Sequence, residues 1–304
     1  MKNRDEGVKS CGKRKCKSCT TEERVPCEVE QGKVMNGAAK KSRSSRKQLV
    51  GKRIVLTQSL DGVSDLKEAL EKEGAEVYFF PLVQTSLSYN KETAADILGE
   101  IATYEWTIFT SAHGVKYFFQ IFFEKYKDLR CLGPMKLACI GEQTAKEIEA
   151  LHLSVDLIPN EFTSNQLATE LIEDGGIENQ RILVVTGDLN DPTLQSRLEA
   201  EGRGIVDAMQ VYKTTSVAVV KDDPIKTYCK TGANAIVFAS PSAVDSYCKQ
   251  AKTFQLGKGA QKPLICSIGP VTTNALKTNG ITPDSEAKQH SRAGLFDILV
   301  EGCK

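Results

Sequence analysis

The stretch TIFTSAHGV, residues 107–115, decides the fold of this chain. Its first half has the apolar pattern of a β-strand, Thr110 and Ser111 follow, and a helical pattern then begins. The segment AIVFASPSAV, residues 235–244, has the same layout. Small hydroxyl side chains between a strand and a helix are typical of the ligand-binding edge of an α/β sheet. The chain therefore contains one candidate binding element twice.

These two segments belong to a tandem repeat with an offset of 128 or 129 residues. The pairs of landmarks that keep this offset are Gly74 and Gly202, Thr85 and Thr214, Ser111 and Ser240, Gly141 and Gly269, and Leu167 and Leu295. Short apolar strings match by chance once or twice, but not throughout a chain in the same order. The sequence therefore predicts an internal duplication.

Each copy of the repeat alternates short β-rich runs with helical patterns. The expected strands are 53–57, 76–80, 106–110 and 137–140 in the first copy, and 181–186, 205–208, 235–239 and 264–268 in the second. Segments between them carry apolar residues with a period near 3.6, which indicates helices that pack on a sheet. Such alternation is typical of parallel sheets covered on both faces. We predict two similar doubly wound α/β domains.

The charge of the chain is distributed unevenly. Residues 1–48 contain 14 Lys or Arg and 6 Asp or Glu, a net of +8. Because the whole chain carries +1, the remaining residues carry −7. We expect the head, residues 1–48, to be disordered because it lacks hydrophobic periodicity. The acidic body lacks the basic field that would attract nucleic acid.

The apolar residues and the cysteines indicate that the protein is located in the cytoplasm. No apolar run reaches the roughly 20 residues that span a bilayer, and the N-terminus lacks the apolar core of a secretory signal. We therefore expect a cytoplasmic protein whose six body cysteines are reduced thiols. A plastid address in the Arg- and Ser-bearing head is the alternative, and its six acidic residues argue against a typical transit peptide. The head cysteines are Cys11, Cys16, Cys19 and Cys27. They could hold a metal ion, but their spacing fits no established pattern, so we predict no metal site.

Hydroxyl residues recur where helices are expected to begin: Ser111, Thr144, Ser240 and Thr272. Ser and Thr are favoured as helix caps, so each could serve its helix alone. Their recurrence at one edge in both copies favours ligand binding for the set. Gly141 and Gly269 fit a tight turn or a close approach of the backbone to a ligand. Because helix N-termini offer free N–H groups and partial positive charge, two such edges facing each other predict a site for a large anion.

Tyr212 and His113 are the candidate acid–base groups near these edges. The repeat places Val83 where the second copy has Tyr212, so the duplication does not require a tyrosine. Tyr212 could pack between domains or offer its phenol as a proton donor, and the sequence favours neither. His113 follows Ser111 at a spacing that does not make a Ser–His catalytic pair, so we expect it to be exposed or to line the cleft. The chain contains no Walker loop, G-x-G-x-x-G or H-E-x-x-H motif.

With these residues in place, the chain resembles the uroporphyrinogen-III synthase family from about Gly51 to its C-terminus. The resemblance rests on FTSAHGV and FASPSAV, the turns IGEQTA and IGPVTT, the segment LEAEGRGIVDAMQVYKT, and the closing SRAGLFDIL. One departure is Thr186, where many members of the family carry an arginine before the glycine. The head has no counterpart in the family.

The resemblance implies two domains that exchange their first units. Residues 51–84 would join residues 215–304, and residues 87–212 would form the other domain. Extended crossovers near Thr85 and Thr214 would link them, in agreement with the repeat. Two such strands make a hinge that allows the domains to close, and we expect a monomer.

The resemblance also implies a cyclising hydro-lyase that converts hydroxymethylbilane, a linear tetrapyrrole rich in carboxylates, to uroporphyrinogen III with inversion of ring D. It implies no metal or organic cofactor, because the pyrroles are reactive and the protein mostly dictates their conformation. By position, Tyr212 matches the tyrosine that is proposed to assist loss of the hydroxyl. The cleft residues of the family are matched by Thr144, Ser240 and Thr272, and by symmetry Ser111. Hand-over of the substrate from hydroxymethylbilane synthase is compatible with this function.

The alternative is a non-catalytic two-domain protein that binds an anionic metabolite in the same cleft and regulates another process. Its basic head could then contact a partner. The products formed from hydroxymethylbilane distinguish the two functions.

Overall fold

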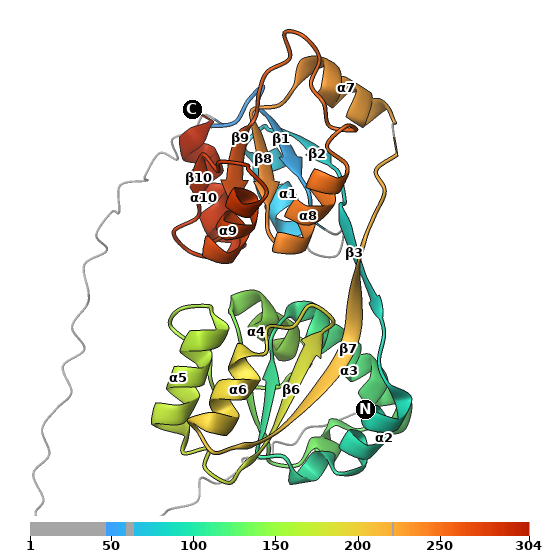
Figure 1. Cartoon of the computed structure of the whole chain (residues 1–304), viewed down its shortest axis with the longest axis vertical. Helices are drawn as coiled ribbons and strands as arrows, with labels where there is room; N and C mark the ends of the chain where they lie inside the picture. The colour runs from blue at the N-terminus through green and yellow to red at the C-terminus, as the bar shows by residue number, and fades with distance from the viewer. Residues whose placement is uncertain (1–46, 59–63, 221, 304) are drawn as a thin grey trace, which may run out of the picture. The chain divides into compact units, whose positions relative to one another are not determined.

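The computed structural model describes residues 47–58, 64–220 and 222–303. These residues form two five-stranded sheets, and strands alternate with helices along the chain (Figure 1). The predicted α/β fold with parallel sheets is confirmed. Residues 1–46 of the predicted head, and with them Cys11, Cys16, Cys19 and Cys27, lie outside the described residues.

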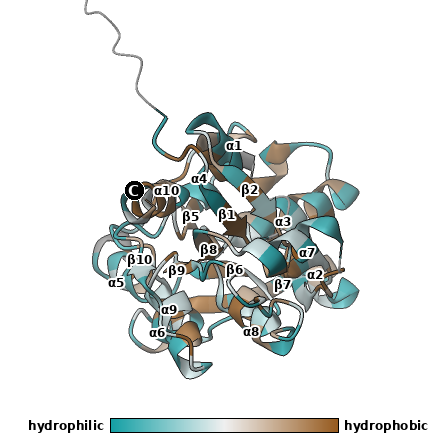
Figure 2. Ribbon diagram, turned by 90° about the horizontal axis from the view of Figure 1, so that it is seen from above, coloured by the Kyte–Doolittle hydropathy of each residue, from teal (hydrophilic) through white to brown (hydrophobic). Residues whose placement is uncertain are grey.

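The first sheet has the strand order β10-β9-β8-β1-β2 and is parallel throughout. Its strands are β1 (Arg53–Leu56), β2 (Glu76–Phe79), β8 (Ala235–Phe238), β9 (Leu264–Ser267) and β10 (Ser285–Glu286). Its helices are α1 (Ser64–Lys72), α7 (Asp223–Thr231), α8 (Pro241–Lys249), α9 (Pro270–Thr278) and α10 (Arg292–Gly302). Successive residues of β1 point to opposite faces, so Ile54 packs with α1 and α10 whereas Val55 packs with α7, α8 and α9. Figure 2 shows β1 and β8 as hydrophobic segments, as expected for strands covered on both faces.

The second sheet has the strand order β3-β7-β6-β4-β5 and is parallel except for its edge strand β3. Its strands are β3 (Val83–Leu87), β4 (Trp106–Phe109), β5 (Lys136–Cys139), β6 (Arg181–Gly187) and β7 (Ile205–Ser216). One face packs against α2 (Lys91–Gly99), α3 (Ala112–Lys125) and α4 (Glu142–Glu149), and the other against α5 (Ser164–Gly175) and α6 (Thr193–Ala200). Short 3₁₀ turns occur at η2 (Ile101–Thr103) and η3 (Leu129–Leu132). Phe109 and Ile108, adjacent in β4, belong to the two opposite cores.

Strand β7 takes part in two different pairings. Its first half is parallel to β6, and its second half is antiparallel to β3, with Thr85 opposite Thr214. The sequence predicted a strand at 205–208 and an extended crossover near Thr214, and the structure joins them into one strand of 12 residues. Strands β3 and β7 thus form a two-stranded ribbon. Along the chain, β3 connects β2 of the first sheet to β4 of the second, and β7 connects β6 of the second sheet to β8 of the first. The division into domains 51–84 plus 215–304 and 87–212 stays a prediction.

Helices α2 and α7 lie in segments for which the sequence predicted no regular element. Both have only nine residues, fewer than the roughly 11–18 residues over which a helical period is read from a sequence. Their starting signals are nevertheless present. Asn90 accepts hydrogen bonds from the Glu92 and Thr93 N–H groups, and Asp222 accepts one from the Ile225 N–H group. Side-chain caps of this kind define a helix start even where the helix is short.

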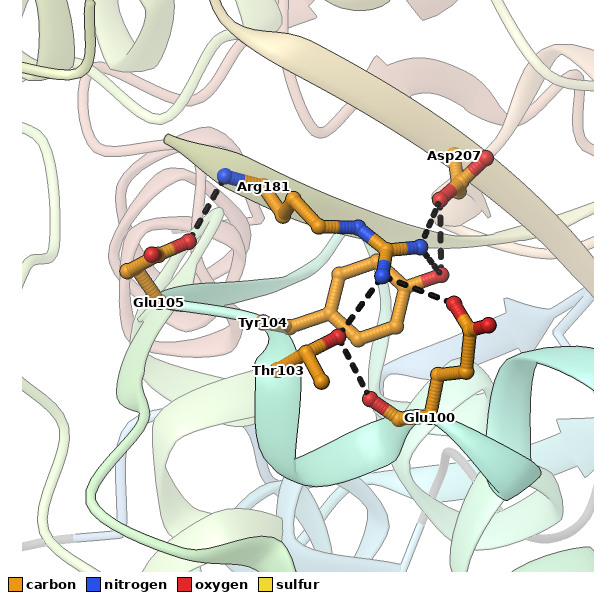
Figure 3. A network of polar contacts seen from close by, with 6 residues as sticks. All are labelled: Glu100, Thr103, Tyr104, Glu105, Arg181 and Asp207. Atoms are coloured by element: carbon orange, nitrogen blue, oxygen red, sulfur yellow. Dashed lines mark hydrogen bonds and ion pairs between the residues drawn. The ribbon is translucent and has the colours of Figure 1, made fainter. Parts of the chain in front are cut away.

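Arg181 organises the amino end of the second sheet (Figure 3). Its guanidinium group lies 4.6 Å from the Tyr104 ring centroid and donates to Glu100 at 2.7 Å and to Asp207 at 3.2 Å. The Tyr104 hydroxyl donates to Asp207 as well, at 2.7 Å. Burial, followed by the hydrogen bond to Asp207, raises the pKa of Tyr104. Because these polar groups bind one another, they stabilise the amino ends of the strands. The candidate site lies at the opposite, carboxyl ends of the strands.

None of the helices in the described part of the chain has both the length and the apolar character needed to cross a bilayer. Within residues 47–58, 64–220 and 222–303, no three His, Cys, Asp or Glu side chains lie together in a way that could hold a metal ion. That the protein uses no cofactor stays a prediction.

Candidate active site

Ser111 and Ser240 cap equivalent helices in the two halves of the chain. Ser111 precedes α3 and accepts a hydrogen bond from the Gly114 N–H group at 3.0 Å. Ser240 precedes α8 and accepts one from the Ala243 N–H group at 3.2 Å. The backbone angles φ and ψ are −159° and 156° at Ser111, and −157° and 152° at Ser240. The duplicated sequence therefore builds the same strand-to-helix turn twice.

The second partners of the two serines differ. The Ser111 hydroxyl lies 3.0 Å from the Tyr212 hydroxyl, whereas the Ser240 hydroxyl lies 3.1 Å from the hydroxyl of Ser242. The structure thus brings together Ser111 and Tyr212, two residues that the sequence singled out separately. One half of the chain presents a phenol beside its capping serine, and the other half presents a second serine.

A register shift between β6 and β7 places Tyr212 beside α3. Gln210 pairs with Thr186, but the next pair along the strands is Tyr212 with Gly187, so β7 carries one extra residue as in a β-bulge. Without this extra residue, the alternation of strand side chains would send Val211 and Tyr212 to opposite faces. Both instead pack against the core formed by α2, α3 and α4. The irregular pairing therefore aims the phenol at Ser111.

Gly187 and Tyr117 hold the Tyr212 ring from different directions. A Cβ atom on Gly187 would lie 2.4 Å from Cζ of Tyr212, so the ring occupies the space that any other residue would fill. The Tyr117 ring stacks on Tyr212 with centroids 5.9 Å apart and an interplanar angle of 30°. The Tyr117 hydroxyl donates to the Thr85 carbonyl at 3.0 Å, which ties α3 to β3. Tyr212 is half-buried in a position with little freedom.

The surroundings of Tyr212 keep its phenol protonated. Burial is the largest cause that raises its pKa, and the nearby Asp188 and Tyr117 act in the same direction. The hydrogen bond with Ser111 acts in the opposite direction, because Ser111 can donate to the phenolate. The ring of His113 lies 5.9 Å from that of Tyr212, which agrees with the expectation that His113 lines the site. At neutral pH the site therefore contains a neutral phenol that can give up a proton.

Gly141 and Gly269 precede helices α4 and α9 but are glycines for different reasons. Gly141 has a φ of 91°, a left-handed conformation that other residues adopt only with strain. Gly269 has an extended φ of 172°, and its constraint is space, because a Cβ atom would lie 2.9 Å from Cδ2 of His290. The close neighbour of Gly269 within the protein is therefore a histidine side chain, and an approach of the Gly269 backbone to a ligand stays a prediction.

Thr144 and Thr272 lie inside the first turns of α4 and α9, two residues after the helices begin. The sequence placed them at the helix starts, where caps are found, but the capping positions are occupied by Gly141 and Gly269. Both threonines are 3% exposed, and the Thr144 hydroxyl donates to the Ile140 carbonyl at 3.3 Å. Their contact with a ligand stays a prediction. Thr163 and Ser291, in contrast, cap α5 and α10 with their side chains.

Two cavities adjoin Ser111 and Tyr212. One, of about 550 Å³, is lined by these two residues with Gly187, Phe162 and Thr163. The other, of about 760 Å³, is lined by residues that follow strands of both sheets, among them Ser111, Gly141, Tyr212, Ser240 and His290. Cavities of roughly 300–1,000 Å³ are typical of sites for small molecules. Neither threonine, Thr144 or Thr272, is among the described residues that line them.

Gly187, Tyr117 and His290 are the site residues that the sequence did not indicate. Gly187 had a usable signal, because a glycine at the end of an apolar strand often marks a bulge or a close approach. Tyr117 is one of several aromatic residues on α3, and it resembles an ordinary core residue in the sequence. His290 lies in the segment before α10, which carries no motif of its own.

Comparison with known proteins settles the family. Residues 64–297 match the family model for uroporphyrinogen-III synthase HemD. The chain belongs to the uroporphyrinogen-III synthase family. This confirms the resemblance inferred from the paired serine loops.

Relatives of the chain are distant in sequence. It is 26% identical over 270 residues to the porphyrin biosynthesis protein HemD of Ruminiclostridium josui, a match that covers 89% of this chain and 52% of that protein. The chain thus spans about half the length of that relative. It is also 26% identical over 250 residues to a putative uroporphyrinogen-III synthase of Methanocaldococcus jannaschii, covering 81% of this chain and 97% of the relative.

Solved structures agree with the fold. A mutant uroporphyrinogen III synthase from the extremely thermophilic bacterium Thermus thermophilus has a TM-score of 0.54 at 16% identity, covering 83% of this chain and 98% of that one. The uroporphyrinogen-III synthetase of Helicobacter pylori has the same TM-score and identity, covering 82% and 99%. At this identity the likeness concerns the fold alone.

Proposed function

We propose that this protein cyclises hydroxymethylbilane to uroporphyrinogen III and water, with inversion of ring D. Membership of the family supports a role in tetrapyrrole biosynthesis. The observation that carries the proposal to this chain is the Tyr212 phenol, held 3.0 Å from Ser111 beside a cavity of ligand size. A site for a reaction that loses a hydroxyl group needs such a proton donor.

In the proposed reaction, Tyr212 gives its proton to the hydroxyl of the substrate's hydroxymethyl group. The C–O bond breaks, water leaves, and the pyrrole nitrogen's electron pair stabilises the resulting azafulvene cation. The substituted α-carbon of ring D attacks the former hydroxymethyl carbon of this cation to give a spiro intermediate. The spiro intermediate fragments and then recloses with ring D inverted. The ring carbon that closes last loses a proton, and the phenolate, which is strongly basic, is reprotonated. The atoms balance as one substrate giving one product and one water.

Binding in this proposal uses groups that suit carboxylates. The described body is built around helices whose N-termini follow the strand ends, where backbone N–H groups and partial positive charge favour anions. Ser240 and the turns at Gly141 and Gly269 lie at these positions. Thr144 and Thr272 would contribute through the backbone of the first turn or after a rearrangement that exposes their hydroxyls. The protein would thereby fix the substrate's conformation, which is catalysis by positioning.

The test is to supply hydroxymethylbilane to the full chain and to separate the isomers formed. The proposed function predicts the type III isomer in amounts that rise with protein concentration. Formation of the type I isomer alone, at the rate seen without protein, would leave the non-catalytic binding protein as the function. Action as a monomer, a cytoplasmic location and hand-over from hydroxymethylbilane synthase remain part of the proposal.

A further inference from the structure

We infer that Ser111 is a positioning residue whose hydroxyl donates to the Tyr212 oxygen and directs the phenol proton into the cavity. This inference rests on the proposed function and assigns Ser111 a role other than binding a substrate carboxylate. It follows from the number of hydrogen bonds that a serine can make, the direction of the Ser111–Tyr212 bond, and the contrast with Ser240.

The hydrogen bonds of Ser111 leave little for a carboxylate. A serine hydroxyl has one proton to donate and two lone pairs. One lone pair of Ser111 accepts from the Gly114 N–H group at the start of α3, and the Tyr212 hydroxyl lies 3.0 Å away. A carboxylate only accepts hydrogen bonds. If the Ser111 proton is given to Tyr212, no proton remains for a substrate carboxylate.

The Ser111–Tyr212 distance is compatible with either oxygen as the donor, and the surroundings favour Ser111. The positive end of the α3 dipole attracts the lone pair of Ser111 and turns its proton away from the helix. Donation by the Gly114 N–H group polarises the Ser111 hydroxyl further, which makes it a better donor. Tyr212 then receives a hydrogen bond, and its own proton is free to point to the ligand.

The ring of Tyr212 is fixed well enough for this orientation to matter. Gly187 admits the ring at a place where a Cβ atom would overlap it, and Tyr117 stacks on it. With the ring held on both sides, the direction of the O–H bond is the freedom that remains, and Ser111 sets it. A group that must meet a reacting atom loses much of its effect when its geometry is loose.

The sister loop shows what the capping serine does without a phenol. Ser240 has nearly the same backbone angles as Ser111 and caps α8 in the same way. The residue equivalent to Tyr212 is Val83, which is buried, and Ser240 is paired with Ser242 instead. Two serines in contact share two protons and can offer at least one to an anion. The duplication has thus given one loop suited to proton transfer and one suited to binding.

A double-mutant cycle tests the inference. We expect Ser111→Ala to lower kcat about tenfold, the size of one hydrogen bond of roughly 1.4 kcal/mol, with KM changed less than about twofold. In the Tyr212→Phe background the same replacement should change kcat less than about twofold, because Ser111 acts through the phenol. Effects that multiply in the double variant would show that Ser111 meets the substrate directly, and would overturn the inference.

A spectroscopic titration gives a readout that capping alone would not move. The ultraviolet absorbance of tyrosinate, measured as the difference between each protein and its Tyr212→Phe counterpart, isolates Tyr212 from the other tyrosines. Loss of a donor to the phenolate should raise the titration midpoint of Tyr212 in Ser111→Ala, whereas Ser111→Thr, which keeps the hydroxyl, should leave it near the original value. An unchanged midpoint in Ser111→Ala would contradict the inference.

Two further variants control for folding. Asn90→Ala removes a helix cap from α2 and should leave both kcat and the Tyr212 midpoint unchanged. Glycine is a better helix cap than alanine, so Ser111→Gly replaces Ser111→Ala if the latter does not fold. The titration needs no substrate. A protein that forms no type III isomer but shows the shifted midpoint would refute the proposed function while leaving the Ser111–Tyr212 contact supported.

Discussion

Replacing Gly187 by alanine would place a methyl group inside the ring of Tyr212. The added Cβ atom would lie 2.4 Å from Cζ, 2.5 Å from Cε2 and 2.8 Å from the hydroxyl oxygen of Tyr212. Carbon atoms in contact prefer about 3.5–4.0 Å, so the ring must retreat by about 1 Å. It would retreat against Tyr117, which stacks on it.

This displacement should affect activity more than stability. Overpacking of a core by one methyl group typically costs about 1–3 kcal/mol, which urea denaturation measures as a lower free energy of unfolding. A catalytic group displaced by about 1 Å can lose roughly 100-fold in rate. We therefore expect the rate of type III formation to fall by about 100-fold in Gly187→Ala, at temperatures where circular dichroism shows a folded protein.

Gly204→Ala is the matched control for this experiment. Its Cβ atom would lie 2.8 Å from Cδ1 of Ile182, a milder overpacking against the end of one side chain in the same sheet. Gly204 directly precedes β7, at the end of the strand away from Tyr212. It should lose stability but retain its kcat. Wild-type activity in Gly187→Ala, or equal losses of kcat in both variants, would refute the reasoning that Gly187 exists to seat the phenol.

Three other predictions concern the same residues. Tyr212→Phe should keep its fold and lose about 10²–10⁴-fold in turnover, the usual effect of one acid–base group, and steady-state activity within about twofold of the original would remove the proton-donor role. Ser240→Ala should raise KM about tenfold, as loss of one hydrogen bond to a charged group does, and Thr272→Ala should do the same if a rearrangement exposes its buried hydroxyl to the substrate. An unchanged KM would exclude the Ser240 side chain from binding, and for Thr272 it would leave the backbone of the first turn as the binding group. The raised pKa of Tyr212 means that, above about pH 10, the unfolded chain ionises this tyrosine before the folded protein does. The free energy of unfolding should therefore fall less steeply with rising alkaline pH in Tyr212→Phe than in the original protein, and identical slopes in pH-dependent denaturation would contradict the shift.

The repeat and the strand patterns were enough to predict eight of the ten strands in the described part of the chain, because apolar runs such as 235–238 are buried on both faces and their composition reflects it. Strand β10 was missed because it has only two residues, and β3 was expected only as an extended crossover. Pairing of Thr85 with Thr214 agrees with the extended crossovers expected at these residues. Helices α2 and α7 were missed because each has only nine residues, too few for its apolar period to stand out in the sequence.

The centre of the site depended on features that a sequence pattern does not contain. Ser111 and Tyr212 are 101 residues apart, and the contact between them requires the extra residue in β7. Strict alternation along β7 would have placed Tyr212 away from α3. The cap positions of Gly141 and Gly269 were missed because glycine is also accepted before a helix, although Ser and Thr are the usual signal, and a threonine follows each glycine three residues later.

The isomer ratio formed from hydroxymethylbilane tests the central claim most directly. Samples with the full chain, with Tyr212→Phe and without protein would be oxidised to the porphyrins and separated chromatographically. We expect type III to predominate with the original protein, to be strongly reduced with Tyr212→Phe and to be absent without protein, where type I forms. Type I as the sole product at every protein concentration would contradict the claim that this chain inverts ring D.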